Sequence, residues 1–228
     1  MEGFHERTAM KGDWKRIWGT ALVSIPWIPD PPAIDGALDD AVWRAAPEIA
    51  LRVMATGARP TRPTRARLAW SHAKLFVSFD CLDPRPFATL TERDAPLWRE
   101  EVVELFLCPD SGSHRYLEIE ISPTGVVYDA WVDATSGRPI LEGSTDFDLE
   151  GLTASVARSE GGWRAEISVP LDELPDPIAH EMRLNLTRIE RPADDAIEYQ
   201  TWAPTQRWFH EPERWPTVEL GPAAQPGF

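Results

Sequence analysis

A tryptophan and a glutamate that lie close together in the sequence could together bind a sugar. In the segment Leu97–Leu107, the flat ring of Trp98 is followed six residues later by Glu104, which lies inside an otherwise apolar run. An aromatic ring can cover the C–H face of a sugar, and a carboxylate can accept strong charge-assisted hydrogen bonds from its hydroxyl groups. A buried core strand has no use for Glu104, so the placement of these residues means more than the total of eleven tryptophans.

The alternation around Glu104 predicts which way its side chain points. Successive side chains of a strand point to opposite faces, so if Val103 and Leu105 face the core, Glu104 faces away from it with Val102 and Phe106. On that face Glu104 could bind a ligand. It could equally be solvated or pair with an arginine. For Trp98, the structural alternative is a ring that covers the end of the fold.

Polar residues on two further predicted strands extend this candidate site. Glu118 and Glu120 share a face with Tyr116, and Glu118 could contact a ligand, pair with Arg188 or lie at the surface. Asn185 alternates with Arg183 and Thr187, which favours the polar face of its strand over a hydrogen-bonding role in the core. Arg188 could contact a ligand, or it could stabilise the fold by crossing to a carboxylate.

A polar loop supplies the remaining candidates. The segment Thr205–Pro212 contains a guanidinium and two aromatic rings, one of which could close on Trp98 from the other side. The alternative is that both rings pack under the loop. The complete predicted carbohydrate-binding set is Trp98, Glu104, Glu118, Asn185, Arg188, Arg207, Trp208 and Phe209. In contrast, we expect Trp43, Trp163 and Trp202 to be core residues.

The composition excludes several classes of partner. The formal net charge of −14 would repel nucleic-acid phosphate and an anionic membrane surface. No segment approaches the roughly 20 apolar residues of a membrane-spanning helix. The polar N-terminus lacks the pattern of a signal peptide, so a cytoplasmic location is expected as the chain is given, and a secreted one if the start is misassigned. Cys81 and Cys108 are expected to be free buried thiols, although a disulfide is possible. Zinc is not expected, because there is no cluster of cysteine and histidine.

Short alternating runs between frequent prolines and glycines predict an all-β, antiparallel sandwich of about ten strands. Helices are expected only at residues 39–46 and 171–174. We divide the chain into an extension (residues 1–29), a sandwich (residues 30–221) and a tail (residues 222–228), and expect Trp14, Trp18 and Trp27 of the extension to pack on the sandwich. The predicted strands are Arg65–Trp70, Leu75–Phe79, Val102–Leu107, Tyr116–Ile121, Val126–Val132, Leu152–Ala157, Trp163–Val169, Arg183–Ile189 and Glu198–Trp202.

Ordered motifs over residues 30–221 resemble family 9 carbohydrate-binding modules. Ile34–Trp43 resembles the opening I-D-G-x-L-D-x-x-x-W of that family, and Trp98–Phe106 resembles its W-x-x-D-x-V-E-x-F segment. Further similar segments follow in the expected order: Leu75–Val77 with Asp83-Pro84, Tyr116–Gly125, Gly162–Pro170, Asn185 with Arg188, Thr201–Pro204, and Phe209-His210 with Pro212.

The resemblance implies a β-sandwich that binds a mono- or oligosaccharide between two aromatic rings without catalysis, commonly beside enzymes that degrade plant cell-wall polysaccharides such as xylan. It also implies structural calcium and no organic cofactor. Candidate calcium ligands are Asp35, Asp39, Asp40, Asp80 and Asp83, since calcium prefers oxygen donors. The chain departs from the family pattern at Phe209, where sugar-binding members have a second tryptophan, and at Glu118, where they have an arginine.

Three other functions stay open. A glycoside-acting enzyme would need two paired carboxylates about 5–5.5 Å apart if it retained configuration, and no spacing singles out such a pair. A haem-binding redox sandwich would use methionine with histidine or lysine, but Met54, Met182 and the scattered histidines show no ligand spacing. A scaffold whose groove has decayed is the last alternative. The sugar and the oligomeric state do not follow from the sequence.

Overall fold

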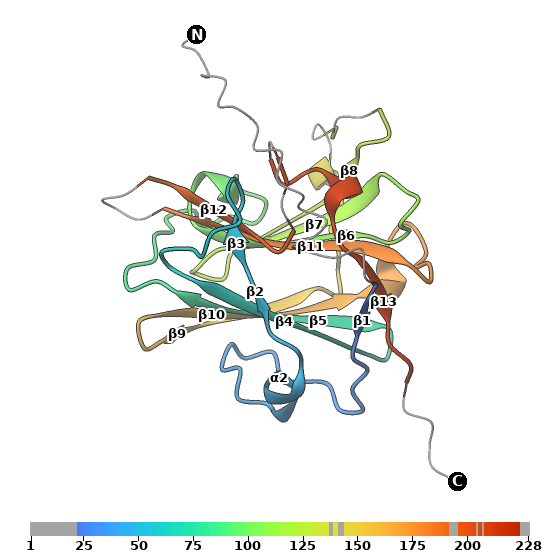
Figure 1. The fold of residues 1–228 in the computed structure, drawn as a ribbon, viewed down its shortest axis with the longest axis horizontal. Coiled ribbons are helices and arrows are strands. Elements are labelled where there is room, and N and C mark those ends of the chain that lie inside the picture. Colours follow the sequence, from blue (N-terminus) through green and yellow to red (C-terminus); the bar gives the residue numbers. More distant parts are fainter. Residues whose placement is uncertain are drawn as a thin grey trace.

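The computed structural model describes residues 22–136, 139–140, 144–191, 196–203, 205–206 and 208–223. Two stacked sheets form a β-sandwich, which confirms the predicted fold class (Figure 1). One sheet has eight strands, in the order β1-β13-β11-β6-β7-β8 with β12 and β3 attached beside β11. The other has five, in the order β2-β4-β5-β10-β9. Apart from the parallel pair β1 and β13, neighbouring strands are antiparallel.

The elements follow the alternating segments of the sequence closely. All nine predicted strands are present, and the structure adds β1, β2, β3 and β13, which are short. The strands are β1 (Val23–Ile25), β2 (Ile49–Ala50), β3 (Arg52–Val53), β4 (Thr64–Ser71), β5 (Lys74–Leu82), β6 (Val102–Cys108), β7 (Arg115–Ile121), β8 (Val127–Asp133), β9 (Thr153–Ser159), β10 (Gly162–Pro170), β11 (Met182–Glu190), β12 (Glu198–Thr201) and β13 (Thr217–Leu220). The helical elements are α2 (Ala41–Ala45) and the single 3-10 turns η1 (Leu97–Arg99), η2 (Ser144–Asp146), η3 (Leu171–Glu173) and η4 (Pro212–Arg214).

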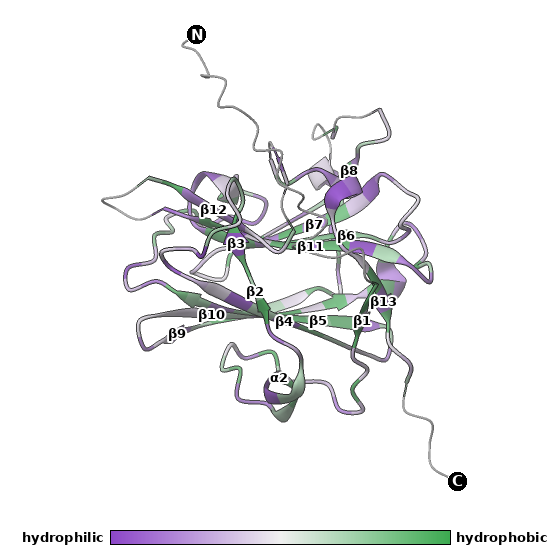
Figure 2. Ribbon diagram, viewed as in Figure 1, coloured by the Kyte–Doolittle hydropathy of each residue, from purple (hydrophilic) through white to green (hydrophobic). Residues whose placement is uncertain are grey.

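The main core lies between the two sheets. Val103, Leu105 and Leu107 of β6 contribute to it, together with alternate residues of the facing strands. Hydrophobic colouring runs along β5, β11 and β13, whereas many connecting loops are hydrophilic (Figure 2). Trp163 is fully buried here and Trp202 packs against the cluster, while Trp43 lies in a separate small cluster with Phe76. The structure confirms the core prediction for these three tryptophans.

A second apolar cluster covers the outer face of the larger sheet. Phe106 of β6 and Tyr116 of β7 pack there against Phe209 and Trp215, which come from the segment before β13. Every residue of β6 is therefore buried, on both faces of the sheet. Other segments of the chain thus cover much of the side of the sheet that carries Glu104.

The turn at Gly125, the first strand and the two cysteines are local features of the sandwich. Gly125 has a φ of +83° in the turn between β7 and β8, a left-handed conformation that glycine adopts without steric cost. Residues 23–25 form an edge strand paired with β13, although they lie in the segment that we assigned to the extension. Trp27 forms a bridge with Trp70 of β4, while Trp14 and Trp18 lie outside the described residues. Cys81 and Cys108 are buried free thiols, as expected.

Candidate functional site

A pocket of about 640 Å³ opens on the outer face of the eight-stranded sheet. Its floor comes from β6, β7, β8 and β11, and its walls come from η1 and from the loop before η4. The lining residues are Met54, Asp94, Pro96, Trp98, Glu104, Glu118, Glu120, Tyr128, Thr145, Ile189, Tyr199, Trp208, Phe209 and His210. Five of the eight predicted site residues are therefore brought together here: Trp98, Glu104, Glu118, Trp208 and Phe209.

Three glutamates form the floor of this pocket. Glu104 on β6 lies directly opposite Glu120 on β7, and Glu118 lies opposite Phe106, one alternation further along the same face. Each of the three side chains is at most 3% exposed. The alternation predicted for Glu104, away from Val103 and Leu105, is confirmed.

Few hydrogen bonds compensate the burial of these carboxyl groups. The Thr187 hydroxyl donates to Glu104, and His210 Nε2 lies 3.6 Å from Glu118 Oε1. The Oε2 atom of Glu120 is buried and has no hydrogen-bond partner. A pocket ligand that donates hydrogen bonds would therefore meet acceptors that the protein itself leaves unsatisfied.

Burial controls the protonation of the floor. It raises the pKa of Glu104 to about 8, against the opposing effect of the Thr187 hydrogen bond. Burial and then repulsion from Glu104 raise the pKa of Glu118 well above its usual value. The same two effects and repulsion from Glu118 raise the pKa of Glu120, while a hydrogen bond from the Trp98 backbone opposes the rise. Desolvation disfavours the charged form of a carboxyl group, so burial favours the protonated form of these three groups.

The Trp98 ring forms one wall. It sits in the η1 turn after Pro96, where the Arg191 guanidinium donates to the Trp98 carbonyl oxygen. Its ring meets Tyr128 edge to face, with centroids 5.4 Å apart. Although the backbone is held in this way, 42% of the side chain stays exposed. The ring is therefore positioned while its face remains accessible.

The opposite wall contains Trp208 and Phe209, which behave differently. Trp208 is 42% exposed and lies beside His210, whereas Phe209 is only 7% exposed and packs against Phe106 and Tyr199. We predicted ligand contact for at least one of these rings, and Trp208 is the accessible one. Phe209 occupies the sequence position of the second family tryptophan, and its buried ring mainly packs behind the accessible surface of the wall. Arg207 lies outside the described residues.

Asn185 is on the predicted face of β11 but serves the fold. Its carbonyl oxygen accepts from the Ala203 backbone N–H, and its amide donates to the Thr201 hydroxyl. It does not line the pocket and is fully buried. The amide thus joins β11 to the segment after β12.

Arg188 lies in the interior between the sheets, and its predicted pairing with Glu118 is wrong. It is on the same side of β11 as Leu184 and Leu186, so it points away from the pocket. Its guanidinium pairs with Asp83 and Glu190, and lies over the Trp163 ring at 5.9 Å. The sequence left open that Arg188 stabilises the fold by crossing to a carboxylate, and this alternative is the one that the structure shows.

Sequence reasoning missed several residues that line the pocket. Glu120 was placed on the correct face but was not selected as a ligand contact. Tyr128 on β8 is paired with Glu120 on β7. The turn at Gly125 fixes this register, so pairing the two predicted strands could have identified Tyr128. His210 could have been found from the polar loop. Its Nδ1 atom lies 2.8 Å from the Tyr116 hydroxyl, and burial lowers its pKa to about 4.

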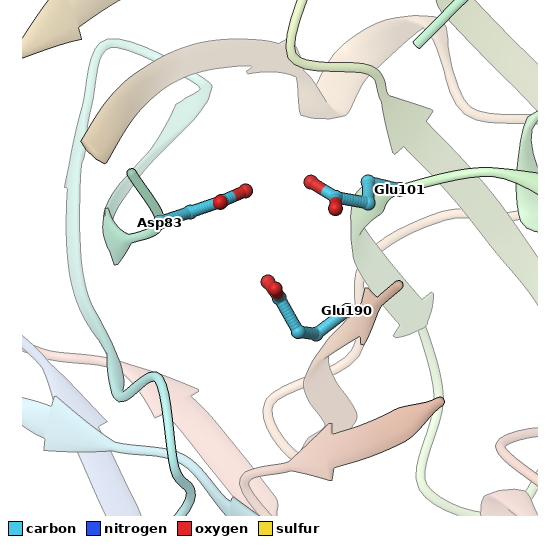
Figure 3. A group of neighbouring side chains, drawn as sticks. All are labelled: Asp83, Glu101 and Glu190. Atoms are coloured by element: carbon cyan, nitrogen blue, oxygen red, sulfur yellow. The ribbon is translucent and has the colours of Figure 1, made fainter. Parts of the chain in front are cut away.

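A second acidic cluster lies between the sheets, outside the pocket. Asp83, Glu101 and Glu190 each direct a carboxylate oxygen to a common point, within 4.8 Å of one another (Figure 3). Asp83 and Glu190 also pair with Arg62 and Arg188. Both carboxylate oxygens of the fully buried Glu101 lack a hydrogen-bond partner.

The other predicted calcium ligands do not join this cluster. Asp35 and Asp40 accept hydrogen bonds from nearby backbone N–H groups, and Asp80 pairs with Arg164 at 3.4 Å. Within the part of the chain that the structure describes, this trio is the one acidic group with metal-ligand spacing. Among the same residues, no helix has the length and apolar character needed to cross a membrane.

Comparison with known proteins decides the family. The model of the carbohydrate family 9 binding domain-like proteins matches residues 34–222, which is most of the chain. The chain belongs to this family. The match also includes the segments that carry both pocket walls, so the family 9 domain and the candidate site coincide in the chain.

Solved structures share the fold of this family 9 domain at low sequence identity. A candidate carbohydrate-binding protein from Bacteroides uniformis ATCC 8492 is 14% identical, with a TM-score of 0.69 over 87% of this chain and 98% of that one. A family 9 module from Caldicellulosiruptor kristjanssonii in complex with cellotriose is 14% identical, with a TM-score of 0.60 over 90% and 95% of the two chains. Its complex with glucose gives 15% and 0.58 over 90% and 97%.

One sequence relative matches only part of the chain and part of its own length. An "Extracellular protein" from Arthroderma benhamiae is 27% identical over 143 residues, which cover 57% of this chain. The match spans 64% of the length of that relative.

Proposed function

We propose that this family 9 domain binds a mono- or oligosaccharide in the pocket between Trp98 and Trp208. The observation that carries the proposal is the combination of two exposed indole rings with a floor of buried, poorly satisfied carboxyl groups. A sugar has both surfaces that this pocket requires: an apolar ring face and a rim of hydroxyl groups. The complexes of the Caldicellulosiruptor module with cellotriose and glucose support the same ligand class.

The surroundings of the pocket suit a chain longer than one sugar. A second hollow of about 470 Å³ shares Met54 and Tyr199 with it and extends along β3 and β12. An oligosaccharide could place one unit between the indoles and the next over Tyr199. A soluble fragment of a plant cell-wall glucan or xylan therefore fits the proposal, with a role in polysaccharide degradation.

The carboxyl groups of the floor favour binding over hydrolysis. A glycoside hydrolase flanks the scissile bond with an acid and a second carboxylate whose environments push their pKa values apart. Here Glu104 and Glu120 are neighbours on one floor, and burial raises the pKa of both. Neither environment holds a carboxylate in the ionised form that a nucleophile needs.

The test is isothermal titration of the protein with glucose, xylose, cellobiose and xylobiose, repeated with Trp98→Ala. Saturable heat that the variant loses would support the proposal. Absence of heat with all four sugars would contradict binding of these neutral sugars. Release of the aryl group from aryl glycosides, lost in Glu104→Gln, would replace binding with catalysis.

We also propose structural calcium at Asp83, Glu101 and Glu190. The donor set fits, because calcium takes oxygen ligands and the unpartnered carboxylate of Glu101 points at the other two. The guanidiniums of Arg62 and Arg188 balance two of the three carboxylate charges, so one negative charge remains for a cation to balance. A bound calcium ion would join β11 to the segments that follow β5 and precede β6, and would thus stabilise the contact between the sheets.

A further inference from the structure

The pocket is acidic on its floor and rim. Its described lining includes Asp94, Glu104, Glu118 and Glu120 but no lysine or arginine. His210 is the lining residue that could carry a positive charge, and its burial lowers its pKa to about 4. A neutral sugar would satisfy hydrogen bonds on this surface but would bring no positive charge to allow these carboxyl groups to ionise.

The placement of the acidic groups opposes their ionisation unless a cation is bound. Glu104 and Glu120 lie directly opposite each other, an arrangement in which like charges destabilise a pair of strands. Glu118 is on the same face, and all three are at most 3% exposed. Water and salt screen such buried charges much less than surface charges. The buried Oε2 atom of Glu120, which has no partner, points to a donor that is supplied from outside the protein.

We propose that the pocket selects a sugar that carries a protonated amine, such as the glucosamine unit of a β-1,4-linked chain. This proposal rests on the proposed sugar binding and names its substrate class. An ammonium group provides three N–H donors and a positive charge, so it can bridge two floor carboxylates. It also lies close to aromatic rings in this pocket, where cation–π attraction adds to the effect of charge.

The walls distinguish an amino sugar from a linear polyamine. Trp98 and Trp208 both line the pocket with exposed flat rings, and a pyranose has a flat C–H face that matches such a ring. A flexible polyamine would gain the same charge contacts but would offer no ring face for stacking. Spermidine is therefore the cation control that separates the two classes.

The experiment compares three disaccharides that differ at the C2 substituent. Cellobiose carries a hydroxyl group there, the glucosamine β-1,4 dimer carries an amine, and its diacetylated form carries a neutral amide. All are titrated at the same pH near 7 and the same low salt concentration. We expect the glucosamine dimer to bind roughly tenfold or more tightly than cellobiose, the scale of one charge-assisted hydrogen bond.

Two variants locate the effect. Glu118→Gln should reduce the preference for the amine to less than about threefold, because it removes one carboxyl group that can ionise beside an ammonium but keeps the shape of the side chain. Glu160→Gln removes an exposed carboxylate at the turn between β9 and β10, in the other sheet, and should keep the full preference. An equal loss in both variants would mean that the overall charge of the protein causes the preference, which contradicts the proposal.

The outcomes separate this inference from the proposed function. If cellobiose or the diacetylated dimer binds as tightly as the amine, the preference is wrong and sugar binding stands. If spermidine binds as tightly as the glucosamine dimer, the pocket recognises a cation and the sugar is not selected. If none of the disaccharides binds, both proposals fail.

Discussion

Glu104 and Glu120 face each other directly across β6 and β7, both buried on the pocket side of the larger sheet. Adjacent like charges in a buried pair are unfavourable, so the pair must hold protons or be neutralised by a ligand. The fold gains nothing from such a pair that two apolar side chains would not supply. Its presence beneath two exposed indoles is therefore best explained by binding.

Replacing Glu104 with glutamine should stabilise the protein at high pH. Burial raises the pKa of Glu104 from 4.5 to about 8. Its contribution to stability is therefore complete below pH 4.5 and is lost as the pH rises towards 8, because ionisation then favours the unfolded chain. The loss is about 1.4 kcal/mol for each pH unit over which the folded group stays protonated. Glutamine cannot ionise and can still accept from Thr187.

Urea unfolding at pH 5 and at pH 8 measures this effect. We expect the Glu104→Gln variant to gain stability over the unmodified protein at pH 8 and to differ little at pH 5. Glu118 and Glu120 face the same site from β7, so removing one charge should also ease their ionisation. A gain of equal size at both pH values would show that packing, and not ionisation, explains the change.

Removing either indole should weaken binding while the fold persists. Trp98→Ala and Trp208→Ala each delete a ring that is 42% exposed, so the melting temperature should change little. Stacking of one ring contributes about 1–3 kcal/mol, which corresponds to roughly 5- to 150-fold in affinity. Titration with the sugar that binds the unmodified protein checks this prediction.

Phe87→Ala is the matched control for the indole variants. Phe87 is 49% exposed and does not line the pocket, so its loss should leave affinity unchanged. If Trp98→Ala lowers the melting temperature by more than a few degrees, its ring covers the end of the sandwich. In that case the loss of affinity would not identify a ligand contact.

The sequence predicted the sheets and the face of the pocket, because both follow from alternation within a strand. Val103 and Leu105 could be assigned to the core, and Glu104 therefore to the other side. What alternation cannot provide is the cover over that face. Phe209 and Trp215 are far from β6 in the sequence, and their packing on Phe106 depends on the path of a loop.

Arg188 shows a second limit of sequence reasoning. A single strand pattern does not reveal whether a charged residue on a face has a buried partner on another strand. Asp83 and Glu190 supply that partner inside the sandwich. Arg188, which was predicted to bind sugar, therefore forms structural ion pairs. Asn185 was placed on the correct face, but its partners Thr201 and Ala203 could be known only from the fold.

Substitution of Arg188 should therefore destabilise the fold. Arg188→Ala leaves Asp83 and Glu190 as buried carboxylates short of a cation, which costs about 3–5 kcal/mol in comparable cases. Arg65→Ala is the control, because Arg65 forms an exposed pair with Glu48 that should be worth at most about 1 kcal/mol. Denaturant unfolding of both variants gives the comparison. Equal stabilities, with sugar affinity lost in Arg188→Ala alone, would restore the ligand role.

Removal of calcium should lower the melting temperature through the cluster of Asp83, Glu101 and Glu190. A ligand that binds only the folded protein stabilises it in proportion to the logarithm of its concentration above the Kd, so melting should rise with added calcium and fall in chelator. In Glu101→Gln this dependence should disappear, because the carboxylate with two unpartnered oxygens is lost. Glu160→Gln, whose exposed side chain lies in the β9–β10 turn, should keep it. Equal melting temperatures in calcium and in chelator would contradict the calcium site. Arg62 and Arg188 would then be the cations that stabilise this cluster.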